Sequence, residues 1–302
     1  MNVRTKFPAH GYAGLSIITL AEVLLFSGDS LIGRWFTPII WTGFILFIDA
    51  LLYKHRGSSP LVSNRREFLF VAIVSVGGWW LFELYNAPRF WRSDLELWWH
   101  YHNLEPNLFL RRVGYDWAFA TIFPALFLAA ELFRATLFKH RSNFRPIKFS
   151  KPTLYVLIFV GATGAILPLV VVSKWFVPIV WLSWIALLDP INALRGSPSI
   201  TIDLARGDYR RLASLLASGA ACGVLWEFWN YWAITKWTYT VPYLGDVKIF
   251  EMPVLGYFGF PPFTVECWAV YVFCRSLLGG KKTQMVDDAQ EDASIWMSDS
   301  NY

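Results

Sequence analysis

Charged residues are scarce in this chain: Asp, Glu, Lys and Arg make up 16% of its 302 residues, whereas hydrophobic residues make up 55%. The mean hydropathy of +0.39 lies outside the range of soluble globular proteins. Cysteine is also rare, and Cys222, Cys267 and Cys274 lie inside apolar runs without the Cys-x-x-Cys or Cys/His spacing of a metal site. These shortages argue against a soluble protein, a disulfide framework, a metal or other cofactor and cysteine redox chemistry. They predict a polytopic membrane protein.

Basic residues are concentrated in alternate loops. Nineteen of the 27 Lys and Arg lie in the N-terminus, in 54–66, 134–151 and 195–211, and in the C-terminal end. The positive-inside rule then places both termini in the cytoplasm, and we expect a bacterial inner membrane. The net charge of +5 is explained by this distribution, so we expect no nucleic-acid partner. No cleavage site follows the first apolar run, so we expect Met1 to be retained.

Long apolar runs dominate what is present. A membrane-crossing helix needs roughly 20 apolar residues. Eight runs approach this length: 11–28, 35–53, 67–86, 115–133, 153–173, 175–194, 211–232 and 259–278. They predict an all-α bundle of about eight transmembrane helices. The loops 87–114 and 234–258 are rich in aromatic residues, and we expect short interfacial or re-entrant segments there.

The chain contains an internal repeat. One match joins Arg34-Trp-Phe-Thr-Pro-Ile-Ile-Trp41 in the first half to Lys174-Trp-Phe-Val-Pro-Ile-Val-Trp181 in the second. Another match joins Leu81-Phe-Glu-Leu-Tyr-Asn86 to Leu225-Trp-Glu-Phe-Trp-Asn230. Further on, Gly114-Tyr115 answers Gly259-Phe260. Four crossings per copy is an even number, which predicts parallel repeats related by an axis along the membrane normal. We therefore predict one four-helix repeat in 1–148, a second in 149–280 and a disordered cytoplasmic tail in 281–302.

Three carboxylates mark the second copy as the candidate site. Glu227 lies at roughly 22 Å along its helix, in the outer third of the bilayer, and Glu266 reaches a similar depth on the next helix. Glu251 lies in the aromatic loop above them. We predict that Glu227 and Glu266 face one another across an aromatic cavity capped by residues 237–257. Acids within a bilayer usually face a cavity or a partner.

Aromatic side chains surround these acids. A buried carboxylic acid can donate a proton, and aromatic faces stabilise a cationic intermediate. These three acids are the candidate catalytic residues; the predicted substrate-binding residues are Trp226, Trp229, Asn230, Trp237, Tyr239 and Trp268. Structural hydrogen bonds to Asn, Trp and Tyr explain the same acids equally well. For Glu83 and Asn86, in the degraded first copy, the structural explanation is preferred.

The other polar residues within the runs suggest structural roles. Asp49 and Asp189 come late in their helices and are predicted to pair with Lys54, Arg56 or Arg195 of the inner loops.

Glu131 is predicted to pair with Arg134 at the cytoplasmic end of its helix. Glu22 lies in the middle of a helix without a counterpart in the second copy, and no role is assigned to it. His100 and His102 give a weak metal or pigment signal without a third ligand, and surface histidines are the more common case.

An acid near the end of one helix, an aromatic Trp-x-Tyr loop, Gly-x-Pro and a Glu in the next helix, all in tandem copies, resemble the integral-membrane lycopene cyclase family of carotenoid synthesis. The matching segments are Trp226-Glu227, Trp237-Thr-Tyr239, Gly259-Phe-Pro261-Pro262 and Glu266. In that family the acids follow the proline directly, whereas Glu266 lies four residues after Pro262. The resemblance implies a cofactor-independent, proton-initiated isoprenoid cyclisation.

Three functions remain open. The first is an enzyme acting on a lipid-dissolved isoprenoid, with Glu227 and Glu266 as acid and base. The second is a non-catalytic scaffold or lipid- or pigment-binding subunit of a larger membrane complex, which the seventeen Trp fit equally well. The third is a transporter, although no pair of Gly-broken helices marks a midplane site. A membrane lipid or isoprenoid is the expected partner, with other membrane subunits under the second function.

Overall fold

The computed structural model describes residues 6–87, 97–140, 144–279 and 285–286, and most of them are helical. The elements of the first half are α1 (Ala9–Phe26), α2 (Ser30–Arg56), α3 (Pro60–Ser63), α4 (Arg65–Asn86), β1 (Trp99–His102) and α5 (Leu108–Thr136). Those of the second half are α6 (Lys151–Val170), η1 (Lys174–Phe176), α7 (Val177–Leu194), α8 (Ile200–Ala205), α9 (Arg210–Trp232), β2 (Lys236–Tyr239), β3 (Lys248–Ile249), β4 (Met252–Pro253), η2 (Val254–Gly259) and α10 (Phe260–Leu277).

Seven of the described helices are long and apolar enough to cross a membrane: α1, α2, α4, α5, α6, α9 and the helical segment Lys174–Leu194 that contains α7. Each matches one of the predicted runs. The eighth run forms α10, which is not among the seven. Two prolines, Glu266 and Arg275 lower its hydropathy, and most of its residues from Phe263 to Val272 are buried inside the bundle. An interior helix needs less apolar surface because it meets protein rather than lipid.

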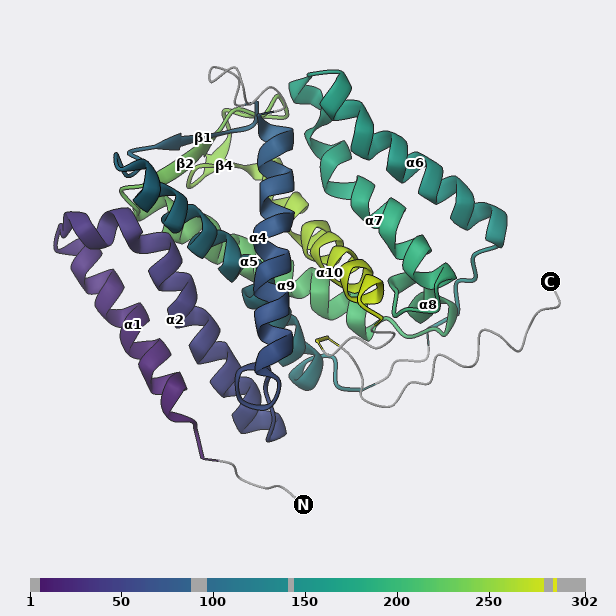
Figure 1. Cartoon of the computed structure of the whole chain (residues 1–302), viewed down its shortest axis with the longest axis horizontal. Helices are drawn as coiled ribbons and strands as arrows, with labels where there is room; N and C mark the ends of the chain where they lie inside the picture. Colours follow the sequence, from purple (N-terminus) through teal and green to yellow (C-terminus); the bar gives the residue numbers. More distant parts are fainter. Residues whose placement is uncertain (1–5, 88–96, 141–143, 280–284, 287–302) are drawn as a thin grey trace.

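The helices form two outer pairs around an inner group. In Figure 1, α1 and α2 lie on one side and α6 and α7 on the other, with α4, α5, α9 and α10 between them. The outer helices expose large apolar side chains, among them Leu20 and Val23 of α1 and Phe159 and Val170 of α6. Exposed apolar surface of this extent is typical of contact with lipid, so the fold is that of an integral membrane helical bundle.

Small residues let each outer pair pack closely. A Cβ on Gly161 of α6 would come within 2.3 Å of the backbone nitrogen of Leu187 in α7. A Cβ on Gly14 of α1 would lie 2.6 Å from the carbonyl oxygen of Gly43 in α2. Such contact between backbones is the usual way in which helices associate inside membranes. Substitution of either glycine would force the helices of its pair apart.

The buried Asp49 and Asp189 each accept hydrogen bonds from a short helix at the lower end of Figure 1. Asp49 accepts a hydrogen bond from the backbone of Leu61 at 3.0 Å, in α3. Asp189 accepts from the backbones of Ile200 and Thr201 at 2.7 and 2.8 Å, in α8. The predicted pairing of both aspartates with Lys or Arg is therefore wrong. The chain turns back after each long helix, which brings the free N–H groups of a new helix to the carboxylate.

At the same end, α2, α5 and α9 are joined through charged side chains. Glu131 of α5 forms an ion pair with Arg56 of α2 at 2.9 Å. Its partner therefore belongs to another helix, whereas the predicted partner, Arg134, belongs to α5. The other oxygen of Glu131 accepts from the backbone of Val286 at 3.1 Å, and the carbonyl of Val286 accepts from Arg211 of α9 at 2.9 Å. Most of the predicted tail, 281–302, lies outside the described residues, but Met285 and Val286 are buried at this junction.

Candidate functional site

A two-stranded ribbon connects the two halves at the upper end of Figure 1. Strand β1 pairs with β2 in antiparallel register, so that Trp99 lies opposite Tyr239 and Tyr101 lies opposite Trp237. Each strand thus contributes the same pair of residue types, Trp-x-Tyr, in opposite directions. Side chains two residues apart lie on the same face of a strand, so these four rings gather on one face of the ribbon.

Two asparagines hold the ribbon over the ends of its helices. Asn86, the last residue of α4, accepts from the backbones of Trp98 and Trp99 and donates to the carbonyl of Trp99 at 2.8 Å. Asn230, near the end of α9, accepts from the backbone of Trp237 at 3.0 Å and donates to its carbonyl at 2.8 Å. A buried amide that satisfies a strand in this way is a structural clamp.

Two glutamates one turn earlier bind the tyrosines of the ribbon. Tyr101 donates to Oε1 of Glu83 at 2.5 Å, and the same oxygen accepts from the indoles of Trp79 at 2.9 Å and Trp99 at 3.2 Å. In the other half, Tyr239 donates to Oε1 of Glu227 at 2.7 Å. The hydroxyl of Tyr239 in turn accepts from the indole of Trp237 at 2.7 Å.

These contacts keep both tyrosines neutral. Burial, followed by the charge of Glu83 and the hydrogen bond to it, raises the pKa of Tyr101 well above its ordinary value. Burial and the same two effects from Glu227 raise the pKa of Tyr239 in the same direction. A hydroxyl with such a pKa keeps its proton at any physiological pH, and that proton is directed toward a carboxylate in each case.

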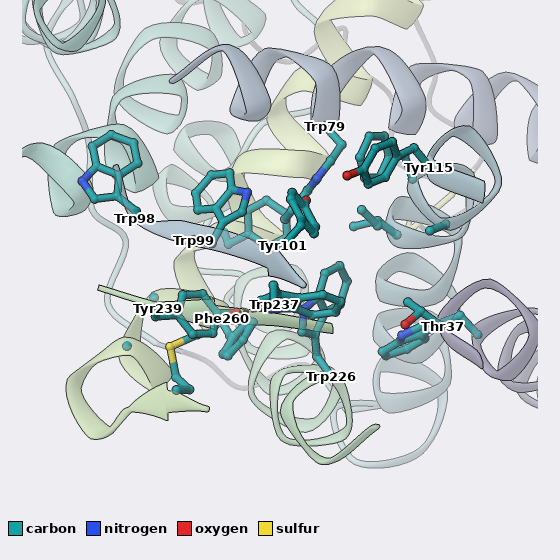
Figure 2. A pocket seen from close by; sticks show the side chains of 18 of the residues that line it. Thr37, Trp79, Trp98, Trp99, Tyr101, Tyr115, Trp226, Trp237, Tyr239 and Phe260 are labelled. Carbon is teal, nitrogen blue, oxygen red and sulfur yellow. Dashed lines mark hydrogen bonds between the residues drawn. The ribbon is translucent and has the colours of Figure 1, made fainter. Parts of the chain in front are cut away.

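A cavity of about 520 Å³ lies beneath the ribbon. Figure 2 shows the aromatic rings around it, with Trp99 and Tyr101 from β1, Trp237 and Tyr239 from β2, and Trp226 from α9. Both halves supply the wall: α2, α4 and α5 on one side, α7, α9, η2 and α10 on the other. The cavity has the size and the mostly apolar lining of a site for a small organic ligand.

Three of the predicted binding residues line this cavity: Trp226, Trp237 and Tyr239. The other three do not. Trp229 donates to Glu22 of α1 at 3.1 Å, which gives that isolated acid a structural role, and Asn230 is the clamp on β2.

Trp268 is fully buried and lies away from the cavity, with the guanidinium of Arg211 4.8 Å from its ring. The prediction placed it in the site as one of the aromatic residues near the acids, and it lies two residues from Glu266 in the sequence. On a helix that spacing turns a side chain to another face.

The three predicted acids do not meet at one point: Glu251 is close enough to Glu227 for their charges to interact, but Glu266 has its contact on another helix. Glu227 contacts the tyrosine of β2, Glu266 accepts from the backbone of Trp184 in α7 at 3.3 Å, and Glu251 pairs with Lys236 at 2.7 Å. No carboxylate of this set lines the cavity. The contacts therefore contradict the predicted pair of acids facing one another across an aromatic pocket. Residues 237–257 do contribute to the cap, but the cavity belongs to both halves instead of the second alone.

Several wall residues were not predicted because they belong to the first half. Trp79, Trp99 and Tyr101 line the cavity together with Arg34 and Arg111. A signal for two of them was present, since Trp99-His-Tyr101 has the spacing of Trp237-Thr-Tyr239. The first copy was interpreted as degraded, so the correspondence between these two motifs was not used to predict the site.

The histidines of β1 bind across the ribbon. His100 contacts the hydroxyl of Thr240 at 2.6 Å, and His102 contacts that of Thr238 at 2.8 Å. Among the described residues, no group of three His, Cys, Asp or Glu side chains could hold a metal ion.

The site can therefore enclose an apolar molecule between aromatic faces. Comparison of the chain with protein-family models, with curated proteins and with solved structures finds no match. The function is accordingly inferred from the geometry of this cavity.

Proposed function

We propose that the chain is an integral membrane protein that binds a lipid-dissolved apolar ligand, of the isoprenoid or polyene class, in the cavity beneath the β1–β2 ribbon. The observation that carries this proposal is the cavity itself: about 520 Å³, walled largely by aromatic side chains from both halves. Flat, rigid rings suit a long conjugated or branched chain because they offer large contact areas at low cost in conformational entropy.

The proposal includes two tandem four-helix repeats with the cavity between them. It is supported by corresponding helix contacts in the two halves: α5 packs against α2 and α4 in the first half, and α10 packs against α7 and α9 in the second. The paired ribbon, the two asparagine clamps and the two Glu–Tyr bonds support it as well. We place the ribbon end outside and the basic end, with both termini, in the cytoplasm.

Binding is favoured over catalysis by the direction of the tyrosine protons. Both cavity hydroxyls donate to glutamates behind them, so neither presents its proton to a ligand. The glutamates themselves are withdrawn from the cavity wall. A general acid must lie within hydrogen-bond reach of the atom that it protonates.

Proton-initiated cyclisation of an isoprenoid is the second candidate. It is favoured by Oε2 of Glu227, which is buried and has no hydrogen-bond partner among the described residues. If Glu227 is protonated, Tyr239 can turn, give its own proton to a double bond and take the proton of Glu227, which leaves a carbocation and a carboxylate. Loss of a proton from the cyclised cation, returned to Glu227 through Tyr239, restores both groups. The resemblance to the lycopene cyclases points the same way. A scaffold role in a larger complex stays the alternative if no ligand is bound.

The first experiment is extraction of the purified protein with organic solvent, followed by absorption spectra and mass spectrometry. We expect an isoprenoid or polyene at about one per chain. Gly114→Leu and Gly259→Leu place a side chain into the cavity from its two ends, at glycines where a Cβ lies 3.5 Å from Trp35 and 4.0 Å from Trp181. Both variants should lose the ligand.

Gly77→Leu is the matched control, because a Cβ at this exposed glycine of α4 meets nothing within 4 Å. It should retain the ligand. An empty wild-type protein that co-purifies with other chains instead would overturn the proposal in favour of the scaffold.

Glu227→Gln separates binding from cyclisation. The amide keeps an acceptor for Tyr239 but cannot give up a proton. If the function is binding, this variant retains the ligand unchanged. Conversion of a linear polyene by the wild type, absent from Glu227→Gln, would establish the enzyme.

A further inference from the structure

We infer that the ligand of this cavity is an amphiphile: a single chain with an anionic headgroup, phosphate or carboxylate, held by Arg34 and Arg111. The inference rests on the proposed binding function and adds to it a charged end and a direction. Both arginines line the same cavity as the aromatic rings.

The two arginines lie on the part of the cavity wall that α2 and α5 form. Arg34 is four residues into α2 and Arg111 is three residues into α5, so each is within about 6 Å of the start of its helix. These helices run side by side in the same direction: Trp35 contacts Gly114 near their beginnings, and Arg56 pairs with Glu131 near their ends. Both cations are therefore at the same level, near the ribbon end of the bundle.

Both guanidinium groups have capacity for a ligand. Arg111 uses Nε to donate to the carbonyl of Glu105 at 2.7 Å, and its two terminal nitrogens make no further hydrogen bond with described residues. Arg34 is exposed and makes neither a hydrogen bond nor an ion pair within the part of the chain that the structure describes. The carboxylate of Glu105, which also lines the cavity, accepts from the backbone of Asn107 at 3.2 Å.

The lining residues that the second half contributes carry no charge. In the repeat alignment Lys174 corresponds to Arg34 but does not line the cavity, and Gly256 corresponds to Arg111. The second half contributes Leu255, Phe258 and other apolar side chains to the wall. The charged side chains of the lining, Arg34, Glu105 and Arg111, therefore all come from the first half and carry a net charge of +1. A ligand without a charge would make no use of this difference between the halves.

The chemistry of guanidinium identifies the headgroup. Its planar donors match the oxygens of a phosphate or carboxylate, and two of them on adjoining helices can bind one anion from two sides. A single arginine near a membrane surface often only extends to water. Here two of them border one cavity whose remaining wall is aromatic, so an alkyl or prenyl chain attached to the anion can fill the interior.

The test measures binding of three probes with the same chain to the purified full-length protein in neutral detergent: hexadecyl phosphate, hexadecanoate and hexadecanol. We expect at least one anion to bind tenfold or more tightly than the alcohol, with an advantage that shrinks as salt is added. Loss of hydrogen bonds to a charged group weakens binding by about tenfold to a hundredfold. Arg34→Gln should show this loss for the anions and none for hexadecanol.

Lys174→Gln is the matched control, since it removes a cation at the position that corresponds to Arg34 in the second half and that does not line the cavity. It should leave all three affinities unchanged. Arg34 has no described partner to lose, so its substitution should not affect folding, and Arg34→Lys should restore part of the anion affinity. A preference for hexadecyl phosphate identifies a phospholipid-like or prenyl phosphate headgroup, and a preference for hexadecanoate identifies a fatty acid.

Two results would overturn the inference. If hexadecanol binds as tightly as the anions and Arg34→Gln changes nothing, the ligand is neutral and the proposed binding function stands without the charged end. If no probe binds and extraction yields no other ligand, both the inference and the proposed function fail.

Discussion

Glu83 and Glu227 show how an acid near the end of a membrane helix can hold a neighbouring strand through hydrogen bonds. One oxygen of Glu83 accepts from Trp79, Trp99 and Tyr101, whereas the corresponding oxygen of Glu227 accepts from Tyr239 alone among the described residues. Each acid accepts a hydrogen bond from a buried tyrosine hydroxyl and thereby fixes the strand that carries this tyrosine. The first copy is therefore the more completely bonded of the two.

This difference predicts unequal costs of truncation. Glu83→Ala leaves three donors without an acceptor and should lower the free energy of unfolding by about 3 kcal/mol or more, since each orphaned group costs about 1–3 kcal/mol. Glu227→Ala leaves one donor and should cost about 1–3 kcal/mol. Thermal unfolding in detergent measures both. A larger loss for Glu227→Ala would contradict the bonding pattern.

Sequence reasoning reached these residues only in part. The spacing of Glu83 and Asn86, and of Glu227 and Asn230, predicts a shared helix face, and both members of each pair contact the ribbon. Their partners could not be predicted, because the register of β1 on β2 joins residues about 140 positions apart. The predicted depth of Glu266 gives no information on the direction of its side chain around the helix, which is set by the packing of α10 against α7.

At the scale of elements, apolar run length predicted most helix ends within about three residues, because a bilayer sets the helix length. The exceptions are the starts of α2 and α5, which lie five and seven residues before the predicted runs. It could not predict the ribbon, since strands of four residues give no periodic signal. The pairing of β1 with β2 is nevertheless the only strand pairing between the halves among the described residues.

The ribbon can be tested by a disulfide. His100 lies directly opposite Thr238, and paired positions of an antiparallel ribbon have Cα atoms about 4.5–5.5 Å apart, within reach of a disulfide. His100→Cys with Thr238→Cys should therefore cross-link on mild oxidation, seen as a disulfide-linked peptide pair by mass spectrometry. Ala205→Cys with Thr238→Cys, at α8 and the ribbon, should not. Failure of the first pair to cross-link would contradict the register.

Helix α9 begins with a second testable contact, outside the membrane. Burial by itself raises the pKa of Asp208, but the hydrogen bonds and charge of Arg210 outweigh burial and lower that pKa to about 2. Because this is below the ordinary value of 3.8, the contact stabilises fully above about pH 5 and is lost as the pH falls through 2. The shift corresponds to at most about 2 kcal/mol.

Asp208→Asn should therefore be less stable than wild type at pH 6 and nearly equal to it at pH 2. The difference in unfolding temperature at the two values measures this. An unchanged difference would show that the carboxylate charge contributes nothing and that only the packing of the side chain matters.

For the whole molecule, the cavity, the ribbon and the two arginines lie at one end, and the short helices capped by aspartates lie at the other. The asymmetry in basic residues predicts that the second end faces the cytoplasm. A ligand dissolved in the outer leaflet then reaches the cavity without crossing the bilayer.

This orientation is tested by labelling intact cells with a membrane-impermeant maleimide. Thr238→Cys, in β2, should react from outside, whereas Ala205→Cys, in α8, should react only after permeabilisation. Background is low because Cys222 and Cys267 are buried, and the chain without new cysteines corrects for Cys274. Reversed labelling would place the cavity at the cytoplasmic face, where its ligand would come from the inner leaflet. Labelling of both positions from outside would contradict a bundle that spans the membrane between ribbon and α8.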